Sequence, residues 1–395
     1  MREHLKSLTG IRFVAALWVV VFHQGGRYGL LKDVLSSCPQ FVANLVHTGY
    51  AAVGVFFVLS GFILAYTYPP GRLPVQQRSF WFARLSRLYP VYFLGLLLCV
   101  PQVRRTMLSP GDPGYKVASI LTPIFMVQAW DARTALAINP PAWAVSAEIF
   151  YYLIFPFAAW WFAGWSRRRL VTAMAALCVL TFACGVWLLL LYDAGTAQLA
   201  IDQPQTIFDL LATHPLYRLP EFLFGVLLGQ FYLATHASSS RNAPAFVGPW
   251  LYVPALTLIL VIAGACGPRI SLPLLRANAT MLFNGLLIYG LACGGGVLHR
   301  WLEHPVLVNL GQASYAIYIL HVPLIVGLRF VDERSLHWGD RHPLLLLAAY
   351  IGLLIPLSLA VYRWVEEPIR LRLRVWWKPT GELAQGLARC KDRAG

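Results

Sequence analysis

The chain has 395 residues, of which 58% are hydrophobic and only 12% are charged, and its formal net charge is +15. This composition excludes a soluble globular protein, because too few polar residues remain for a water-facing surface, and it predicts that membrane lipids surround much of the chain. The basic residues lie in short loops between apolar segments, so the positive charge indicates membrane topology and anion binding, and no nucleic-acid partner is expected.

Apolar segments recur from one end of the chain to the other, with lengths near the roughly 17 to 25 residues that a membrane-crossing helix needs. They lie at approximately residues 8–26, 48–66, 88–103, 118–130, 143–163, 170–192, 215–234, 249–266, 280–298, 313–328 and 343–364. This pattern predicts an all-α protein, a polytopic bundle of membrane helices without internal repeats. The segment at 118–130 is the shortest and contains Pro123, so we expect a re-entrant or interfacial segment there.

The distribution of Lys and Arg predicts the orientation of the chain, because short basic loops stay on the cytoplasmic side. If the fourth segment does not cross, the N-terminus, the loop at 69–87, the arginine triplet at 167–169 and the basic C-terminal tail all lie on that side. We therefore predict about ten transmembrane helices, with both termini in the cytoplasm. The membrane domain is expected to cover residues 1–370, and a basic cytoplasmic tail residues 371–395.

The first apolar segment, LTGIRFVAALWVVVFHQ, places Arg12 near its cytoplasmic start and His23 near its outer end. The eleven positions between them correspond to about 16 Å of helix rise. Ionisable side chains at membrane depth are costly and usually face a cavity, so both residues are candidates for catalysis. The alternatives are an arginine that only determines topology and a histidine at the membrane interface.

The fifth segment begins with NPPAWAVSAEIFYY, which places Glu148 one or two turns inside an apolar helix that enters from the outer side. We expect Glu148 to lie in the same leaflet as His23 and to orient its imidazole. An ion pair that only joins helices is the alternative. Trp143 is a candidate substrate contact, although an interfacial anchor is the simpler interpretation, and Ser146 is a candidate hydrogen-bond donor to the substrate.

The segment FWFARLSRLYP sets Arg84 and Arg87 three residues apart, on one face of a helix that enters from the cytoplasm. Guanidinium groups bind phosphates in a bidentate manner, which suits coenzyme A with its pyrophosphate and 3'-phosphate. A topology signal without a ligand is the alternative. The small residues of AVGVFFVLSGFIL, among them Gly54, Ser60 and Gly61, are interpreted as helix-packing residues rather than catalytic ones.

Other ionisable positions are given structural interpretations. His321, in YILHVP, is interpreted mainly as a packed histidine, and Glu221 is expected to pair with the nearby Arg218. Glu366 and Glu367 follow the last apolar segment, where a capping or surface role is expected. The remaining histidines are scattered without ligand spacing, so no metal site is predicted.

Taken in chain order, several of these motifs resemble acyltransferase family 3, a family of membrane O-acyltransferases. The similarity extends from residue 8 to about residue 370 and is carried by the Arg–His spacing of the first helix, FFVLSGF, RLSRLYP, the PAW…S.E element, RLPEFLFG, ASYAIYILHVPL and the closing VEEP. One departure from the family pattern is Ala144, where many members have a serine directly after the tryptophan.

The resemblance implies a ten-helix core in which cytoplasmic acetyl-CoA, the acyl donor, feeds acylation of a sugar hydroxyl or similar acceptor outside the cytoplasm. Carried over by motif, His23 is the catalytic histidine and Arg12 its essential partner. Arg84 and Arg87 are then the donor-side arginines, and Glu148 is the acid of the tryptophan–serine–glutamate motif. No permanently bound cofactor is implied.

Together these residues predict that His23 acts as general base on an acceptor hydroxyl, which attacks the thioester directly, with an acyl-histidine intermediate as the variant. A glycan, a glycolipid or a small secreted molecule would suit as acceptor, and the sequence selects neither the acceptor, the acyl chain length nor the oligomeric state. The main rival is a proton-coupled transporter in which His23, Glu148 and Arg12 form an ion relay. A structural membrane subunit is a second rival.

Overall fold

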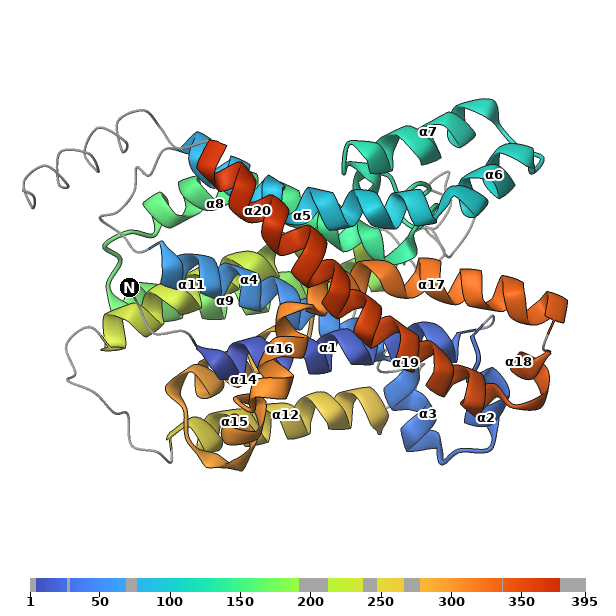
Figure 1. Cartoon of the computed structure of the whole chain (residues 1–395). Coiled ribbons are helices and arrows are strands. Elements are labelled where there is room, and N and C mark those ends of the chain that lie inside the picture. Colours follow the sequence, from blue (N-terminus) through green and yellow to red (C-terminus); the bar gives the residue numbers. More distant parts are fainter. Residues whose placement is uncertain are drawn as a thin grey trace, which may run out of the picture.

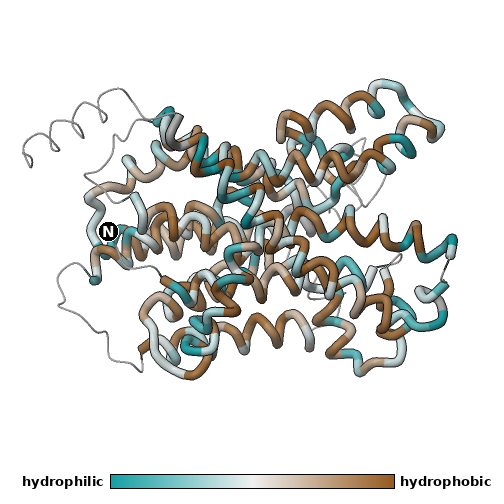
Figure 2. The backbone as a smooth tube through the Cα atoms, viewed as in Figure 1, coloured by the Kyte–Doolittle hydropathy of each residue, from teal (hydrophilic) through white to brown (hydrophobic). Residues whose placement is uncertain are grey.

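The computed structural model describes residues 5–26, 29–68, 77–191, 212–236, 247–265, 278–335 and 337–376. Within these ranges every regular element is a helix, which confirms the predicted all-α class. Most of the long helices run along one common direction and form a single bundle (Figure 1). Hydrophobic residues extend along these helices, including those on the outside of the bundle (Figure 2).

The N-terminal half of the chain supplies most of the helices around the candidate site. They are α1 (Lys6–Gly25), α2 (Lys32–Ser36), α3 (Gln40–His47), α4 (Ala52–Thr67), α5 (Gln77–Leu98), α6 (Val100–Leu108), α7 (Pro113–Ile124), α8 (Trp143–Trp161) and α9 (Arg167–Leu191). Three short 3-10 turns, at Gly49–Ala51, Gln128–Trp130 and Pro140–Ala142, connect some of them.

The C-terminal half completes the bundle and ends in a long, interrupted helix. Its helices are α11 (Pro215–His236), α12 (Val247–Gly264), α14 (Met281–Cys293), α15 (Gly296–Leu302), α16 (Pro305–Gln312), α17 (Ser314–Ser335), α18 (Trp338–Arg341), α19 (Pro343–Val361) and α20 (Glu367–Trp376). A π-helical turn, Tyr362–Glu366, joins α19 to α20. Of the predicted tail at 371–395, only the part within α20 lies among the described residues.

Seven of the described helices are long and apolar enough to cross a membrane, or up to nine spans if each of two bent helix pairs counts as one. Large apolar side chains such as Val179, Leu180 and Leu258 are exposed on the outside of α9 and α12, as in a protein surrounded by lipid. The chain is therefore a multi-pass membrane protein. The predicted segment at 215–234 coincides with α11, which is not among these candidates, so the number of ten spans remains a prediction.

The segment expected not to cross is short in the structure. Helix α7 has 12 residues, which corresponds to about 18 Å and falls short of the roughly 30 Å of a hydrocarbon layer. The start of α1, the start of α5, the turn between α8 and α9 and the end of α20 lie toward the same end of the bundle (Figure 1). Described parts of the basic regions are thus gathered at one end, as predicted, whereas residues 69–76 lie outside the described chain.

Glycines bring α4 and α11 into close contact. A Cβ atom on Gly61 would clash with the carbonyl oxygen of Phe222, and one on Gly225 would clash with that of Val58. Such close backbone approach is typical of membrane helix pairs. The small-residue interpretation of this segment is confirmed for Gly61, but Ser60 faces a cavity and is not a packing residue.

Candidate active site

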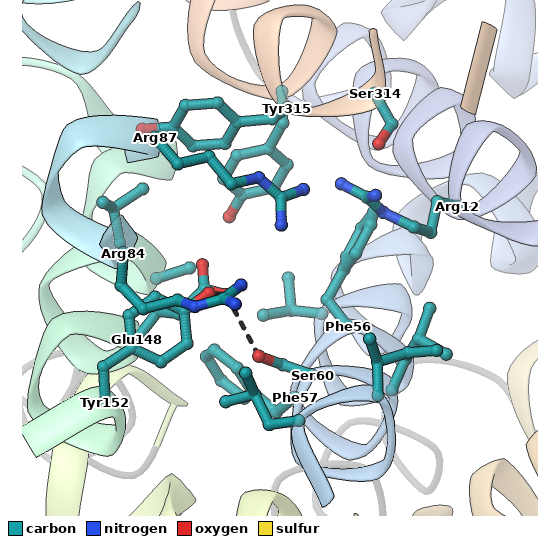
Figure 3. Close-up of a pocket in the computed structure, with 17 residues that line it drawn as sticks. Arg12, Phe56, Phe57, Ser60, Arg84, Arg87, Glu148, Tyr152, Ser314 and Tyr315 are labelled. Carbon is teal, nitrogen blue, oxygen red and sulfur yellow. Dashed lines mark hydrogen bonds between the residues drawn. The ribbon is translucent and has the colours of Figure 1, made fainter. Parts of the chain in front are cut away.

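A cavity of about 120 Å³ lies inside the bundle, between α1, α4, α5, α8 and α17. Arg12, Arg84, Arg87 and Glu148 line it, so the structure brings together four of the predicted site residues from three helices. Arg12 and Arg87 point toward one another across the cavity, and the guanidinium group of Arg84 lies near Glu148 (Figure 3). The remaining wall is mainly apolar and aromatic.

The carboxylate of Glu148 is held by two hydroxyl groups. The Ser60 hydroxyl donates a hydrogen bond of 3.2 Å to Oε1 of Glu148, and the Tyr152 hydroxyl, one turn later on α8, donates to the same oxygen. Both donors keep the carboxylate directed into the cavity, where its charge interacts with those of Arg12 and Arg87. Glu148 therefore lies with Arg12, Arg84 and Arg87, which together are called the arginine cluster below.

The two arginines of α5 are held by different partners. Arg84 donates a hydrogen bond of 2.9 Å to the hydroxyl of Tyr68, and its guanidinium lies 5.4 Å from the centre of the Phe80 ring. Arg87 pairs with Glu366, with 3.8 Å between Nε and Oε1. Arg84 is thus held by a hydrogen bond and an aromatic ring, whereas Arg87 is held by a longer ion pair without a hydrogen bond among the described residues.

The surface or capping role predicted for Glu366 is wrong. Its side chain is only 1% exposed, and it lies beside Arg87 at the end of the π-helical turn. The wider π-helical turn interrupts the α-helical phase between α19 and α20, and such turns often occur at functional sites. In the sequence, Glu366 follows an apolar segment and precedes a basic stretch. This pattern is typical of an ordinary helix end at the membrane surface, so it gives no indication that the side chain is buried.

The predicted pair of His23 and Glu148 does not form. His23 does not line the cavity, and its Nδ1 atom lies 2.9 Å from the Val19 carbonyl oxygen and 3.2 Å from Nε2 of His321. Three guanidinium groups stabilise the charge of Glu148 better than one neutral imidazole, which explains why the acid lies with the arginines. His321, predicted mainly as a packed histidine, is fully buried and is the side-chain partner of His23.

The predicted depth of Glu148 is wrong because the segment before α8 packs partly into the bundle, although Arg133 and Trp130 within it stay exposed. Five apolar residues of this segment are almost fully buried: Met126, Ala129, Ala135, Ile138 and Ala142. Helix α8 therefore begins inside the bundle, and its first turns reach the level of the arginines.

The two predicted substrate contacts on α8 lie outside the cavity lining. Trp143 packs edge-on against Phe57, with ring centroids 5.8 Å apart. Ser146 is buried and accepts a hydrogen bond of 3.3 Å from the backbone N–H of Ala129, so it anchors the preceding segment. Ala144, at the position where the family often has serine, does line the cavity and adds a methyl group to its wall.

A row of neighbouring aromatic rings lies between the cavity and the pair of His23 and His321. Phe56 and Tyr318 line the cavity, with their ring centroids 5.9 Å apart. The Tyr318 ring lies 6.0 Å from that of His321, which in turn lies 4.8 Å from that of His23. Tyr318 therefore borders both parts of the site.

A second buried ion pair stands apart from this cavity. Arg218 and Glu221 are 2.9 Å apart, which confirms the predicted pair, and Arg218 also donates a hydrogen bond of 2.6 Å to Oδ1 of Asn278. These contacts join α11 to the segment that precedes α14. Among the described residues, no group of three His, Cys, Asp or Glu side chains is arranged to hold a metal ion.

Comparisons with known proteins identify the family. The family model described as "Acyltransferase domain", that of acyltransferase family 3, matches residues 5–363. Acyltransferase MdmB of Streptomyces mycarofaciens is 27% identical over 332 residues, covering 81% of this chain and 79% of that protein. Peptidoglycan O-acetyltransferase OatA of Listeria monocytogenes is 22% identical over 395 residues, covering 93% of this chain but only 56% of OatA. No solved structure matches. The chain therefore belongs to acyltransferase family 3 and is a membrane O-acyltransferase.

Proposed function

We propose that this enzyme transfers an acyl group, specifically acetyl, from cytoplasmic acyl-CoA to a hydroxyl of an extracytoplasmic or lipid-linked glycan or of a small glycoside. The observation that carries the proposal is the convergence of Arg12, Arg84 and Arg87 on one cavity inside an apolar bundle. Charged groups are costly at such depth, and three guanidinium groups around one cavity favour an anionic ligand. The similarity to OatA, a peptidoglycan O-acetyltransferase, supports acetyl as the acyl group and a glycan as acceptor.

The cavity suits the slender pantetheine arm of the donor rather than the whole coenzyme. Its volume of about 120 Å³ is well below the roughly 300–1,000 Å³ of pockets that enclose a whole drug-sized ligand. The nucleotide and its phosphates then stay at the mouth, near Arg84 and Tyr68, while the slender pantetheine arm enters. No phosphate group has to enter the hydrocarbon layer in this arrangement.

The mouth and both termini are assigned to the cytoplasmic side of the bacterial inner membrane. Support comes from the basic regions that gather at one end of the bundle, which the positive-inside rule assigns to the cytoplasm (Figure 1). His23 lies on α1 about 16 Å further toward the other end, which suits an acceptor that arrives from outside.

In the proposed reaction His23 is the general base. Its imidazole takes the proton of the acceptor hydroxyl while the acceptor oxygen attacks the thioester carbonyl carbon. The carbon–sulfur bond then breaks, the acyl–oxygen bond remains, and the coenzyme thiolate receives a proton from the imidazolium. The thioester must pass Phe56 and Tyr318 to reach this position.

The transporter alternative loses its main support. It required an ion relay through His23, Glu148 and Arg12, but the contacts of His23 are with Val19 and His321, while Glu148 lies in the arginine cluster. The family match also favours the enzyme.

The test is titration of the purified full-length protein in lipid nanodiscs with acetyl-CoA, followed by calorimetry. The double variant Arg84→Gln/Arg87→Gln is expected to weaken binding by at least roughly 100-fold, because each lost charge-assisted contact with phosphate costs about 1.5–3 kcal/mol. Arg133→Gln is the matched control, since Arg133 is exposed and pairs with Asp131 in its own turn. Absence of acetyl-CoA binding to the wild type, or equal binding by the double variant, would contradict the proposal.

The acceptor is tested separately. Envelope glycans and secreted glycosides from a strain that lacks the protein are compared with the parent by mass spectrometry. The proposal predicts loss of one acetyl mass increment from a specific molecule, restored by the wild-type protein but not by His23→Gln.

A further inference from the structure

The histidine pair joins two helices that are far apart in the sequence. His23, on α1, and His321, on α17, lie with 3.2 Å between Nδ1 of the first and Nε2 of the second. Their rings are inclined by 62° with centroids 4.8 Å apart. The proposed reaction uses only His23, so the presence of a second, fully buried imidazole beside it is unexplained.

The protonation pattern of His321 follows from its partners. Its Nδ1 atom lies 2.7 Å from the carbonyl oxygen of Tyr318. A carbonyl oxygen only accepts hydrogen bonds, so Nδ1 of His321 must carry a proton. In the neutral imidazole Nε2 is then an acceptor, and its lone pair is directed at His23.

The protonation of His23 follows from that of His321. Its Nδ1 atom lies beside two acceptors, the Val19 carbonyl oxygen at 2.9 Å and Nε2 of His321 at 3.2 Å. A bare Nδ1 would face two lone pairs, so the proton is on Nδ1 and is shared between them. The lone pair of His23 is therefore on Nε2, to which no described residue makes a hydrogen bond. This is the atom that can accept a proton from a hydroxyl.

The surroundings hold His321 in place. Its own carbonyl oxygen accepts a hydrogen bond of 2.8 Å from the hydroxyl of Tyr350. Pro323 lacks the N–H that would bond the carbonyl of Ile319, and the side-chain amide of Asn139 donates to that carbonyl at 3.1 Å instead. The helix turn that carries His321 is thus anchored from two other segments.

We propose that His321 is a positioning residue that holds the His23 ring and keeps its proton on Nδ1, so that Nε2 is the general base. This inference rests on the proposed function of His23. When Nε2 takes the acceptor's proton, the imidazolium keeps its Nδ1–H hydrogen bonds to His321 and Val19, so no rotation or second proton transfer is needed. The role expected of Glu148 is filled by a neutral imidazole and a backbone carbonyl.

The kinetic test uses the full-length protein in nanodiscs, with acetyl-CoA as donor, water as acceptor and release of the coenzyme thiol as the signal. His23→Gln is expected to lower kcat by roughly 100-fold or more, and His321→Leu by roughly 10- to 100-fold, with donor affinity unchanged. His321→Gln should recover part of the loss, because its amide oxygen can accept from Nδ1 of His23. His299→Leu is the matched control, since His299 lies on α15 and pairs with Glu303.

A double-variant cycle separates positioning from general stability. If His321 acts through His23, the combined variant His23→Gln/His321→Leu is no slower than His23→Gln alone, since the two effects are not additive. Full loss in His23→Gln with no loss in His321→Leu, or strictly additive losses, would overturn the inference and leave the proposed function intact. Unchanged activity in His23→Gln would overturn the proposed function itself.

A spectroscopic measurement decides the point without turnover. Nitrogen NMR of protein labelled with ¹⁵N-histidine is assigned with the His23→Gln variant. We expect His23 to be protonated on Nδ1, with a nitrogen–nitrogen coupling across the hydrogen bond to His321 that disappears in His321→Gln. Protonation of His23 on Nε2, or absence of that coupling in the wild type, would overturn the inference whatever the kinetics show.

Discussion

Arg12 and His23 lie on the same helix, but the two halves of α1 have opposite kinds of surroundings. Arg12 faces a cavity with two further guanidinium groups, and the acid side chains of Glu148 and Glu366 lie close enough to offset their charge. The polar partners of His23 among the described residues are a carbonyl oxygen and a neutral imidazole. A permanently charged group inside a membrane needs acids nearby, whereas an imidazole is satisfied by neutral hydrogen bonds. The difference separates a site for an anionic donor from a site for proton transfer.

The largest expected effect is on the histidine side. His23→Gln should lower the rate of acyl transfer by roughly 10²- to 10⁴-fold, because it removes the general base. Acetyl-CoA affinity should stay within about twofold, since the arginine cluster is untouched. Calorimetry together with coenzyme release measures both quantities. A variant that loses donor binding as well would mean that the two halves are one site.

The next effect concerns the buried acid beside Arg87. Glu366→Gln should destabilise the protein by about 2–3 kcal/mol, below the full cost of breaking a buried pair because Arg87 is 26% exposed. It should also tighten acetyl-CoA binding, because the guanidinium groups gain uncompensated charge. Thermal unfolding and calorimetry in detergent check both changes. The neighbouring Glu367→Gln is the matched control, and an equal effect there would contradict the special role of Glu366.

A smaller change is expected when one donor-side arginine is replaced. Arg87→Gln alone should weaken acetyl-CoA binding by roughly 10- to 30-fold, or about 1.4–2 kcal/mol, with no change in the His23 tautomer. Binding titrations combined with nitrogen NMR test this independence. A shift of the histidine signals in this variant would show that the arginine-lined cavity and the histidine pair are coupled.

The smallest effect is expected at the anchor of the histidine pair. Tyr350→Phe removes the hydrogen bond to the His321 carbonyl and should cost about 1 kcal/mol of stability. A modest fall in kcat, smaller than that of His321→Leu, should accompany it. If Tyr350→Phe were as inactive as His23→Gln, the tyrosine itself would have a more direct role than anchoring.

Much of the proposed donor site, the arginine-lined cavity, could be predicted from the sequence. Arg12, Arg84 and Arg87 were identified by their depth and helical spacing, which reflect the cost of charge in lipid. The partners of these residues could not be predicted, because helix periodicity fixes neither the rotation of two helices nor their relative depth. The expected pairing of Glu148 with His23 assumes that α8 begins at the outer surface, but the preceding segment inserts several apolar side chains, such as Met126 and Ala142, into the bundle.

The pairing of His23 with His321 could not be predicted from the sequence either. His321 is one histidine among apolar residues, and nothing in its local sequence distinguishes a packed histidine from a partner of another histidine. Only the packing of α1 against α17 brings the two rings together. Glu366 was missed because the π-helical turn that buries it has no clear sequence pattern.

The most direct test of the donor site is a cryo-EM structure of the full-length protein in nanodiscs with a non-hydrolysable acetyl-CoA analogue. We predict that the phosphates lie beside Arg84 and Arg87 and that the pantetheine arm crosses the cavity toward Tyr318, with the acyl group directed at Nε2 of His23. A nucleotide bound anywhere outside the arginine-lined cavity, or at the opposite end of the bundle, would contradict this account.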